Sequence, residues 1–150
     1  MVPAPVEGRR LLIKNVRIFD DISDHYFTGD VLIEGTKVAA VETSPIAEDP
    51  NTVVIDGADR VLVPGMSDAH VHLFGLANTL FDMMLASQFH LIARTLARAK
   101  ETLLRGLTTV RDMAGDTAGV KNVINGDPVV GPRIYPSQAA ISQTAGPGDF

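Results

Sequence analysis

The sequence predicts an α/β fold, in which a β-rich part, residues 1–63, precedes alternating strands and helices in residues 64–150. Short β-branched runs separated by turn residues fill the first part. In the second part, residues 79–105 contain neither glycine nor proline, and strand-like runs lie on both sides of them. A strand, a helix and a second strand in this order make a βαβ unit with parallel strands.

Five strands are expected in the first part, over residues 11–19, 31–33, 37–41, 52–55 and 60–63. Gly35, within the connection Glu34-Gly35-Thr36, predicts a hairpin, because glycine readily takes the positive φ of a tight turn. Asp56-Gly57 predicts a second hairpin between the last two strands. A small β-sandwich accommodates these strands, and a free-standing β-module of the binding type is the alternative.

One long helix is expected over residues 79–105, with an apolar seam that is listed as Leu85, Phe89, Ile92, Leu96, Ala99 and Leu103. Thr79 and Asp82 have the spacing of a capping box, and Gly106 stands where a helix stops. A bundle helix would have the same pattern, but the strand-like run 107–113 favours a βαβ unit. A further helix over residues 117–125 and a third strand over 131–136 continue the alternation, and a Gly-rich loop over 139–149 follows.

The composition of the chain excludes several kinds of partner and metal ligand. The 150 residues carry a net charge of −5, so no basic surface for nucleic acid or an anionic membrane is expected. No apolar run is long enough to span a bilayer, and no signal peptide is apparent, which favours a cytoplasmic protein. Cysteine is absent, so histidine and carboxylate side chains are the available metal ligands. His25 lies in an acidic loop and His90 lies one position off the apolar seam, and both are expected at the surface.

The residues most typical of a functional site follow the apolar run 61–63. Side chains alternate across an extended strand, so Asp68, His70 and His72 are expected to share one face. Two imidazoles then converge on one point, and neutral imidazole is a common ligand of zinc and related ions. Asp68 is expected to accept a hydrogen bond from a ligand ring. This pattern indicates a divalent metal site at His70 and His72, and a chance His-x-His without a metal is the alternative that the residues alone leave open.

Several motifs in the same order resemble the metal-dependent amidohydrolase superfamily, in particular its branch of prolidase-like dipeptidases and imidazolonepropionase-like proteins. They are Pro64-Gly65 before Asp-x-His-x-His, Gly-Leu-Thr-Thr-Val-Arg-Asp over 106–112, Gly-Pro-Arg over 131–133, and the glycine-rich segment 141–149. The resemblance implies that a small β-sandwich precedes a (β/α)₈ barrel. A barrel takes about 250 residues, so residues 64–150 correspond to about three of its eight βα units. We therefore expect the N-terminal part of a longer enzyme, with the remaining metal ligands beyond Phe150.

The resemblance also implies an activity. It predicts hydrolysis of amide or peptide bonds in a dipeptide-like or N-acyl amino acid substrate, by water that one or two divalent ions, zinc foremost, activate. A fragment with only His70 and His72 is expected to be inactive alone, and a homo-oligomer is compatible with the sequence. Cyclic amide hydrolysis and metal-assisted decarboxylation are alternatives within the superfamily. A non-catalytic β-module with a partial barrel is the alternative of another class.

Four other positions bear on the site. Asp112 ends the second strand of the βαβ unit, where it serves either as an anchor beside the site or as a helix-capping or loop carboxylate; the latter is favoured. Ser142 and Thr144 are candidates to line the substrate pocket, or they satisfy loop backbone. Many members of the resembled branch have histidine where this chain has Pro147. Proline has no side-chain donor or metal ligand, so a substrate contact there is not expected.

Overall fold

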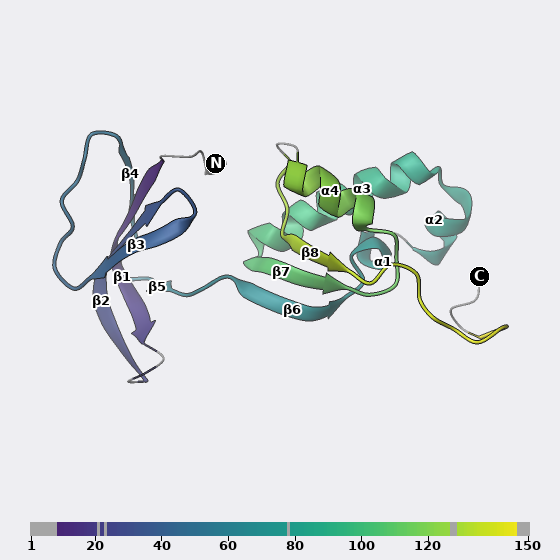
Figure 1. The fold of residues 1–150 in the computed structure, drawn as a ribbon, viewed down its shortest axis with the longest axis horizontal. Helices are drawn as coiled ribbons and strands as arrows, with labels where there is room; N and C mark the ends of the chain where they lie inside the picture. Colours follow the sequence, from purple (N-terminus) through teal and green to yellow (C-terminus); the bar gives the residue numbers. More distant parts are fainter. Residues whose placement is uncertain (1–8, 21, 23, 78, 127–128, 147–150) are drawn as a thin grey trace. The chain divides into compact units, whose positions relative to one another are not determined.

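The computed structural model describes residues 9–20, 22, 24–77, 79–126 and 129–146 (Figure 1). The chain divides into two compact units, Met1–Pro64 and Gly65–Phe150. The first contains strands, and the second alternates strands with helices. The mixed α/β class predicted from the sequence is confirmed. Among the described residues, no helix combines the length and the apolar character needed to cross a membrane.

The described strands of the first unit form one five-stranded sheet. They are β1 (Arg10–Asp20), β2 (His25–Glu34), β3 (Lys37–Glu42), β4 (Thr52–Asp56) and β5 (Val61–Leu62). Their order is β3-β2-β1-β4, and β5 also pairs with β1. Leu12, Val16, Val31 and Leu32 are buried in this unit. A second sheet that would complete a sandwich stays a prediction.

The hairpin around Gly35 is confirmed, because β2 and β3 are antiparallel and Gly35 has a φ of 59°. The hairpin expected around Asp56-Gly57 is wrong. β4 and β5 do not pair with each other; both pair with β1 in parallel. β1 has a bulge at Asn15. The segment after β4 is bonded to this bulge, because Gly57 N donates to Lys14 O (2.7 Å) and Asp59 N donates to Asn15 O (2.9 Å).

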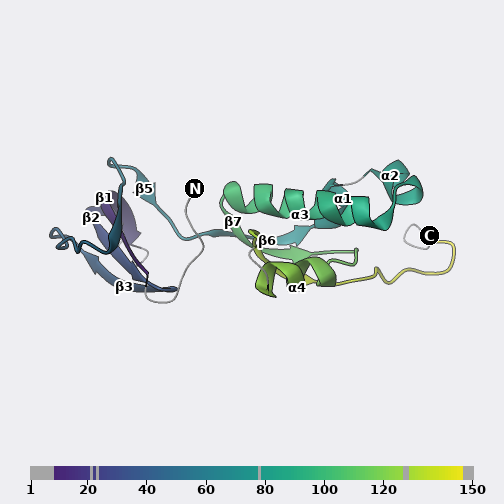
Figure 2. The same cartoon turned by 90° about the horizontal axis from the view of Figure 1, so that it is seen from above.

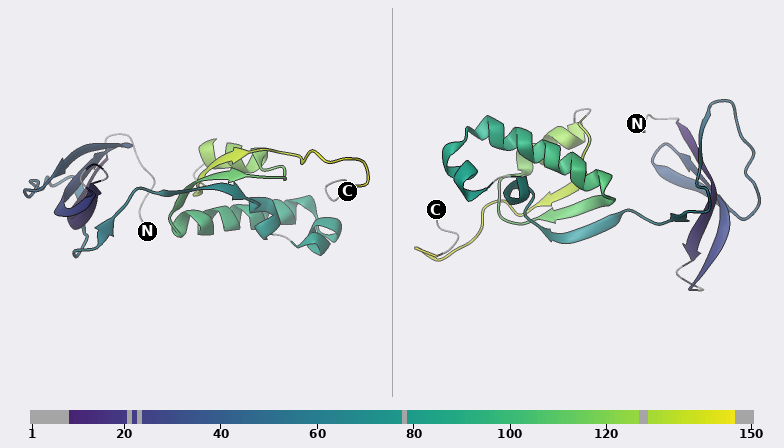
Figure 3. Two further views of the ribbon diagram at one scale, coloured as in Figure 1. Left: turned by 90° about the horizontal axis from the view of Figure 1, so that it is seen from below. Right: turned by 180° about the vertical axis from the view of Figure 1, so that it is seen from behind.

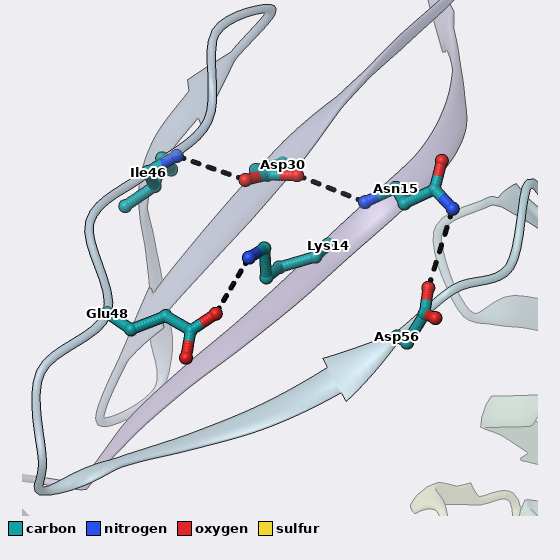
Figure 4. A network of polar contacts seen from close by, with 6 residues as sticks. All are labelled: Lys14, Asn15, Asp30, Ile46, Glu48 and Asp56. Atoms are coloured by element: carbon teal, nitrogen blue, oxygen red, sulfur yellow. Dashed lines mark hydrogen bonds and ion pairs between the residues drawn. The ribbon is translucent and has the colours of Figure 1, made fainter.

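Asp30 forms hydrogen bonds that join the long connection between β3 and β4 to the sheet (Figure 4). It is 6% exposed, and its two carboxylate oxygens accept from the backbone N–H groups of Asn15 and Ile46, each at 3.0 Å. Lys14 and Glu48 form an ion pair of 2.7 Å nearby, which raises the pKa of the lysine. The bulge at Asn15 and the connection are therefore held by one buried carboxylate.

In the second unit, three parallel strands form a sheet in the order β6-β7-β8. These are β6 (Met66–Val71), β7 (Leu107–Asp112) and β8 (Arg133–Pro136). Their carboxyl ends point to the same end of this unit, where α1 and α2 lie (Figures 1 and 3). The helices α3 (Gln88–Leu104) and α4 (Ala118–Gly126) run alongside the strands (Figure 2). The predicted βαβ unit, the helix near 117–125 and the short third strand are confirmed.

The prediction of one continuous helix over residues 79–105 is wrong, because the structure has two helices there. These are α2 (Leu80–Leu85) and α3, and a short α1 (Leu73–Ala77) precedes them. Ala86 is extended, with φ −80° and ψ 154°, and the Ser87 side chain caps α3 by accepting from His90 N. The break turns the first two residues of the predicted seam outward, so Leu85 and Phe89 are 69% and 90% exposed. The capping box at Thr79 is confirmed.

The core of the second unit lies between the sheet and the two helices. Val71, Val110 and Ile134 from the three strands pack with Ala99 of α3 and Val120 of α4. This face of the sheet is therefore covered, and alternate residues of the strands are directed away from it.

Two glycines bring the strands of this unit together. Gly106 has a φ of 92° and ends α3 directly before β7. A Cβ on Gly65 would lie 2.2 Å from the Cγ2 and Oγ1 atoms of Thr108, so the close approach of the chain before β6 to β7 requires glycine.

Candidate metal site at the end of β6

The end of β6 brings His70 and His72 together. Their Nε2 atoms are 3.3 Å apart, and the ring centroids are 5.1 Å apart at an interplanar angle of 78°. Both side chains are exposed, whereas Val71 between them is buried in the core. The two imidazoles thus converge on the uncovered side of the strand, as the His-x-His spacing predicts.

The separation of the two nitrogens fits a tetrahedral metal ion. Two imidazole nitrogens bound at about 2.0–2.1 Å to one such ion are about 3.3 Å apart. The His72 Nδ1 atom lies 2.7 Å from the Met113 carbonyl oxygen, which only accepts, so this nitrogen carries the proton. In the neutral ring, Nε2 then carries the lone pair that can bind a cation. The residues present therefore fit a divalent metal ion.

The expectation for Asp68 is wrong in its geometry. β6 has an irregular register against β7: Asp68 pairs with Val110, and Val71 pairs with Asp112. This bulge places four residues of β6, 68–71, opposite three of β7, 110–112, so Asp68 lies on the covered face with Val71. It lines a cavity of about 240 Å³ with residues that include Val71, Leu73 and Arg105. Its carboxylate accepts from the backbone N–H of His70 at 3.0 Å, and no bond to a ligand ring is seen.

Asp112 is bonded to Leu73, the residue that follows His72. Its side chain is fully buried, and it accepts from Leu73 N at 2.5 Å and from the Thr117 hydroxyl at 2.6 Å. Leu73 begins α1, and Thr117 precedes α4. The interpretation of Asp112 as a helix-capping or loop carboxylate agrees with these bonds, and its neighbour Arg111 is exposed on the opposite face of β7.

Two other predicted residues, Ser142 and Thr144, are exposed in the segment after β8. Pro147 lies outside the described residues. Within the described ranges, no group of three or more His, Cys, Asp or Glu side chains is placed to hold a metal ion. This part of the chain thus offers two ligands, and further ligands are required for a complete site.

Two contributors to the site carry little signal in the sequence. The Met113 carbonyl is a backbone group, which no residue-type pattern reveals. Thr117 is predicted only as the start of a helix, and the hydroxyl-bearing residue at that position is the one available signal. His25 and His90 are exposed, as expected.

Comparisons with known proteins bear on this arrangement. Ochratoxinase from Aspergillus niger is 40% identical over 93 residues, which cover 60% of this chain and 19% of the relative. Adenine deaminase from Desulforamulus reducens is 39% identical over 72 residues, covering 48% of this chain and 12% of the relative. No family model matches the chain.

Solved structures cover more of the chain. A prolidase complexed with N-methylphosphonate-L-proline has a TM-score of 0.81 at 30% identity, over 94% of this chain and 35% of that chain. The structure of A. niger ochratoxinase has a TM-score of 0.72 at 29% identity, over 97% of this chain and 34% of that chain. The resemblance to the amidohydrolase superfamily is confirmed. The chain spans less than a fifth of the curated amidohydrolase relatives and about a third of these solved structures.

Proposed function

We propose that the protein carrying this sequence is a metal-dependent hydrolase of amide or peptide C–N bonds, with a dipeptide-like or N-acyl amino acid substrate. The observation that carries the proposal is the 3.3 Å separation of the His70 and His72 Nε2 atoms on the uncovered side of β6. Similarity to ochratoxinase and to a prolidase supports C–N bond hydrolysis as the reaction class.

Each residue of the site has a defined part in this proposal. His70 and His72 hold a divalent ion, zinc foremost, through Nε2. The Met113 carbonyl fixes the proton of His72 on Nδ1, at 2.7 Å. When bound, the ion supplies a Lewis acid for the scissile carbonyl and brings the pKa of water into the neutral range. The uncovered face of β6 leaves the histidines open to a substrate and to further ligands.

The fold of the whole protein is part of the proposal. We assign residues 64–150 to the first three βα units of a (β/α)₈ barrel, because three parallel strands have helices on one face and the histidines on the other. Residues 1–63 are assigned to a small β-sandwich domain. Catalysis in such barrels occurs at the carboxyl ends of the strands, the end at which His72 lies. The other ligands and the group that shuttles the proton then come from further strands.

A hydrolytic deaminase is the second candidate. The similarity to adenine deaminase favours it, because deamination also replaces a C–N bond by attack of activated water. Hydrolysis of a cyclic amide uses the same two histidines and is tested with the same protein. A panel of dipeptides, N-acyl amino acids, cyclic amides and aminopurines distinguishes these reactions by which compound is turned over.

The test is the replacement His70→Ala in the native protein that contains this sequence. We expect loss of bound metal, measured by elemental analysis per chain, and loss of hydrolysis on the substrate panel. His90→Ala is the matched control, since His90 is an exposed histidine at the start of α3. Normal metal content with retained turnover in His70→Ala would overturn the assignment. Absence of metal and turnover in the unaltered protein would favour a non-catalytic module.

A further inference from the structure

Residues 71–73, which carry His72, are held by two residues at the end of β7. Met113 N donates to Val71 O at 2.7 Å, and His72 Nδ1 donates to Met113 O at 2.7 Å. Leu73 N donates to the Asp112 carboxylate at 2.5 Å. Three consecutive residues of one strand end are thus bonded to two consecutive residues of the other. On the β7 side of this set, Met113 contributes backbone groups and Asp112 contributes its side chain.

Asp112 also joins the other elements around the site. Its second carboxylate oxygen accepts from the Thr117 hydroxyl, and its backbone carbonyl accepts from Ser137 N at 2.8 Å. Asp112, Thr117 and Leu73 are all fully buried. A buried carboxylate with two fixed donors holds its position, because loss of either bond leaves a polar group without a partner. The carboxylate therefore links the end of β6 to the residue that precedes α4.

We propose that Asp112 is a positioning residue for the metal: by binding the Leu73 N–H, it fixes the peptide that follows His72 and keeps the His72 ring on the Met113 carbonyl. This inference rests on the proposed metal-dependent function. The His72 ring is bonded to Met113 and the peptide after it is bonded to Asp112, which is the preceding residue. A shift of Asp112 therefore moves both the ring and the peptide. Without the carboxylate, the ring is free to turn, and Nε2 loses its alignment with that of His70.

The test compares Asp112→Ala, Asp112→Asn and Asp116→Ala in the native protein, stripped of metal with a chelator and titrated with Co²⁺ alone. Asp112→Ala should weaken Co²⁺ binding by about 10- to 100-fold, as losses of groups that orient metal ligands do, and should alter the Co²⁺ d–d spectrum. Asp112→Asn should recover most of the affinity, since its amide oxygen still accepts from Leu73 N and the Thr117 hydroxyl can accept from its NH₂. Asp116 is exposed in the same loop and should have no effect.

A measurement on the metal-free protein separates the positioning role of Asp112 from the proposed metal-dependent function. In the stripped protein, the ¹⁵N shifts of His72 should report a proton on Nδ1, and Asp112→Ala, but not Asp116→Ala, should change them. Unchanged Co²⁺ affinity and spectrum in Asp112→Ala would overturn the positioning role and leave the proposed function standing. No Co²⁺ binding by the unaltered protein would overturn the function, and the ¹⁵N shifts would still decide whether Asp112 positions the ring.

Asp112→Ala is at a buried position and tests nothing if it fails to fold. Thr117→Val then answers the same question, because it removes one of the two bonds that hold the carboxylate while Leu73 N–H keeps the other. A smaller loss of Co²⁺ affinity in the same direction is expected. Wild-type affinity together with wild-type His72 shifts in a folded Thr117→Val protein would overturn the proposal.

Discussion

Gly65→Ala should destabilise the second unit through a single contact. The added Cβ would lie 2.2 Å from the Cγ2 and Oγ1 atoms of Thr108 and 2.7 Å from its Cβ. Rotation about χ1 of Thr108 moves the first two atoms but not Cβ, so the backbone of β6 or β7 must shift. Overpacking of this kind costs about 1–3 kcal/mol, and we expect the upper end of the range because no rotamer relieves the clash.

The measurement is the free energy of unfolding of the native protein by denaturant, for Gly65→Ala alone and in a Thr108→Gly background. Thr108→Gly removes all three atoms, so the cost of Gly65→Ala should fall to near zero there. Gly119→Ala is the control: nothing lies within 4 Å of its added Cβ, and alanine within a helix is favoured by about 1 kcal/mol over glycine. If Gly65→Ala lowers the free energy of unfolding by the same amount in both backgrounds, the proposed contact is not the cause.

Two further predictions concern single carboxylates. Asp30→Ala should lower the free energy of unfolding by about 2–6 kcal/mol, because it leaves the N–H groups of Asn15 and Ile46 without their acceptor, at about 1–3 kcal/mol each; an unfolding midpoint equal to that of the unaltered protein would contradict this. Hydrogen bonding to the backbone N–H of Thr79, followed by its hydroxyl and by Arg94, lowers the pKa of Asp82. Because the pKa is lower in the folded state, this stabilisation of α2 is present above the ordinary aspartate pKa and is lost as the pH falls through the lowered value. A carboxyl ¹³C titration should show the midpoint of Asp82 rising in Thr79→Ala, which loses the hydroxyl and keeps the backbone N–H, and an unchanged midpoint would refute the contribution of the hydroxyl.

Local sequence determined the elements whose signals are short in range. The β-branched run of β1, the turn at Gly35, the capping box at Thr79 and the stop at Gly106 all lie where residue type and spacing place them. The His-x-His spacing likewise determined that two imidazoles share one side of β6, since side chains separated by two residues in an extended segment point the same way.

Tertiary structure decided the features that depend on pairing between distant segments. The bulge in β6 arises from its register against β7. Because of it, Asp68 lies on the covered face and not on the histidine face that regular alternation predicts. The parallel pairing of β4 and β5 along β1 follows a bulge more than forty residues earlier in the chain, so Asp56-Gly57 did not form a hairpin. His72 is oriented by a carbonyl of β7's end, and Asp112 is buried between three elements. Local sequence patterns predict neither the register of paired strands nor the partners of backbone hydrogen bonds. Both depend on contacts between distant segments that form only in the folded chain.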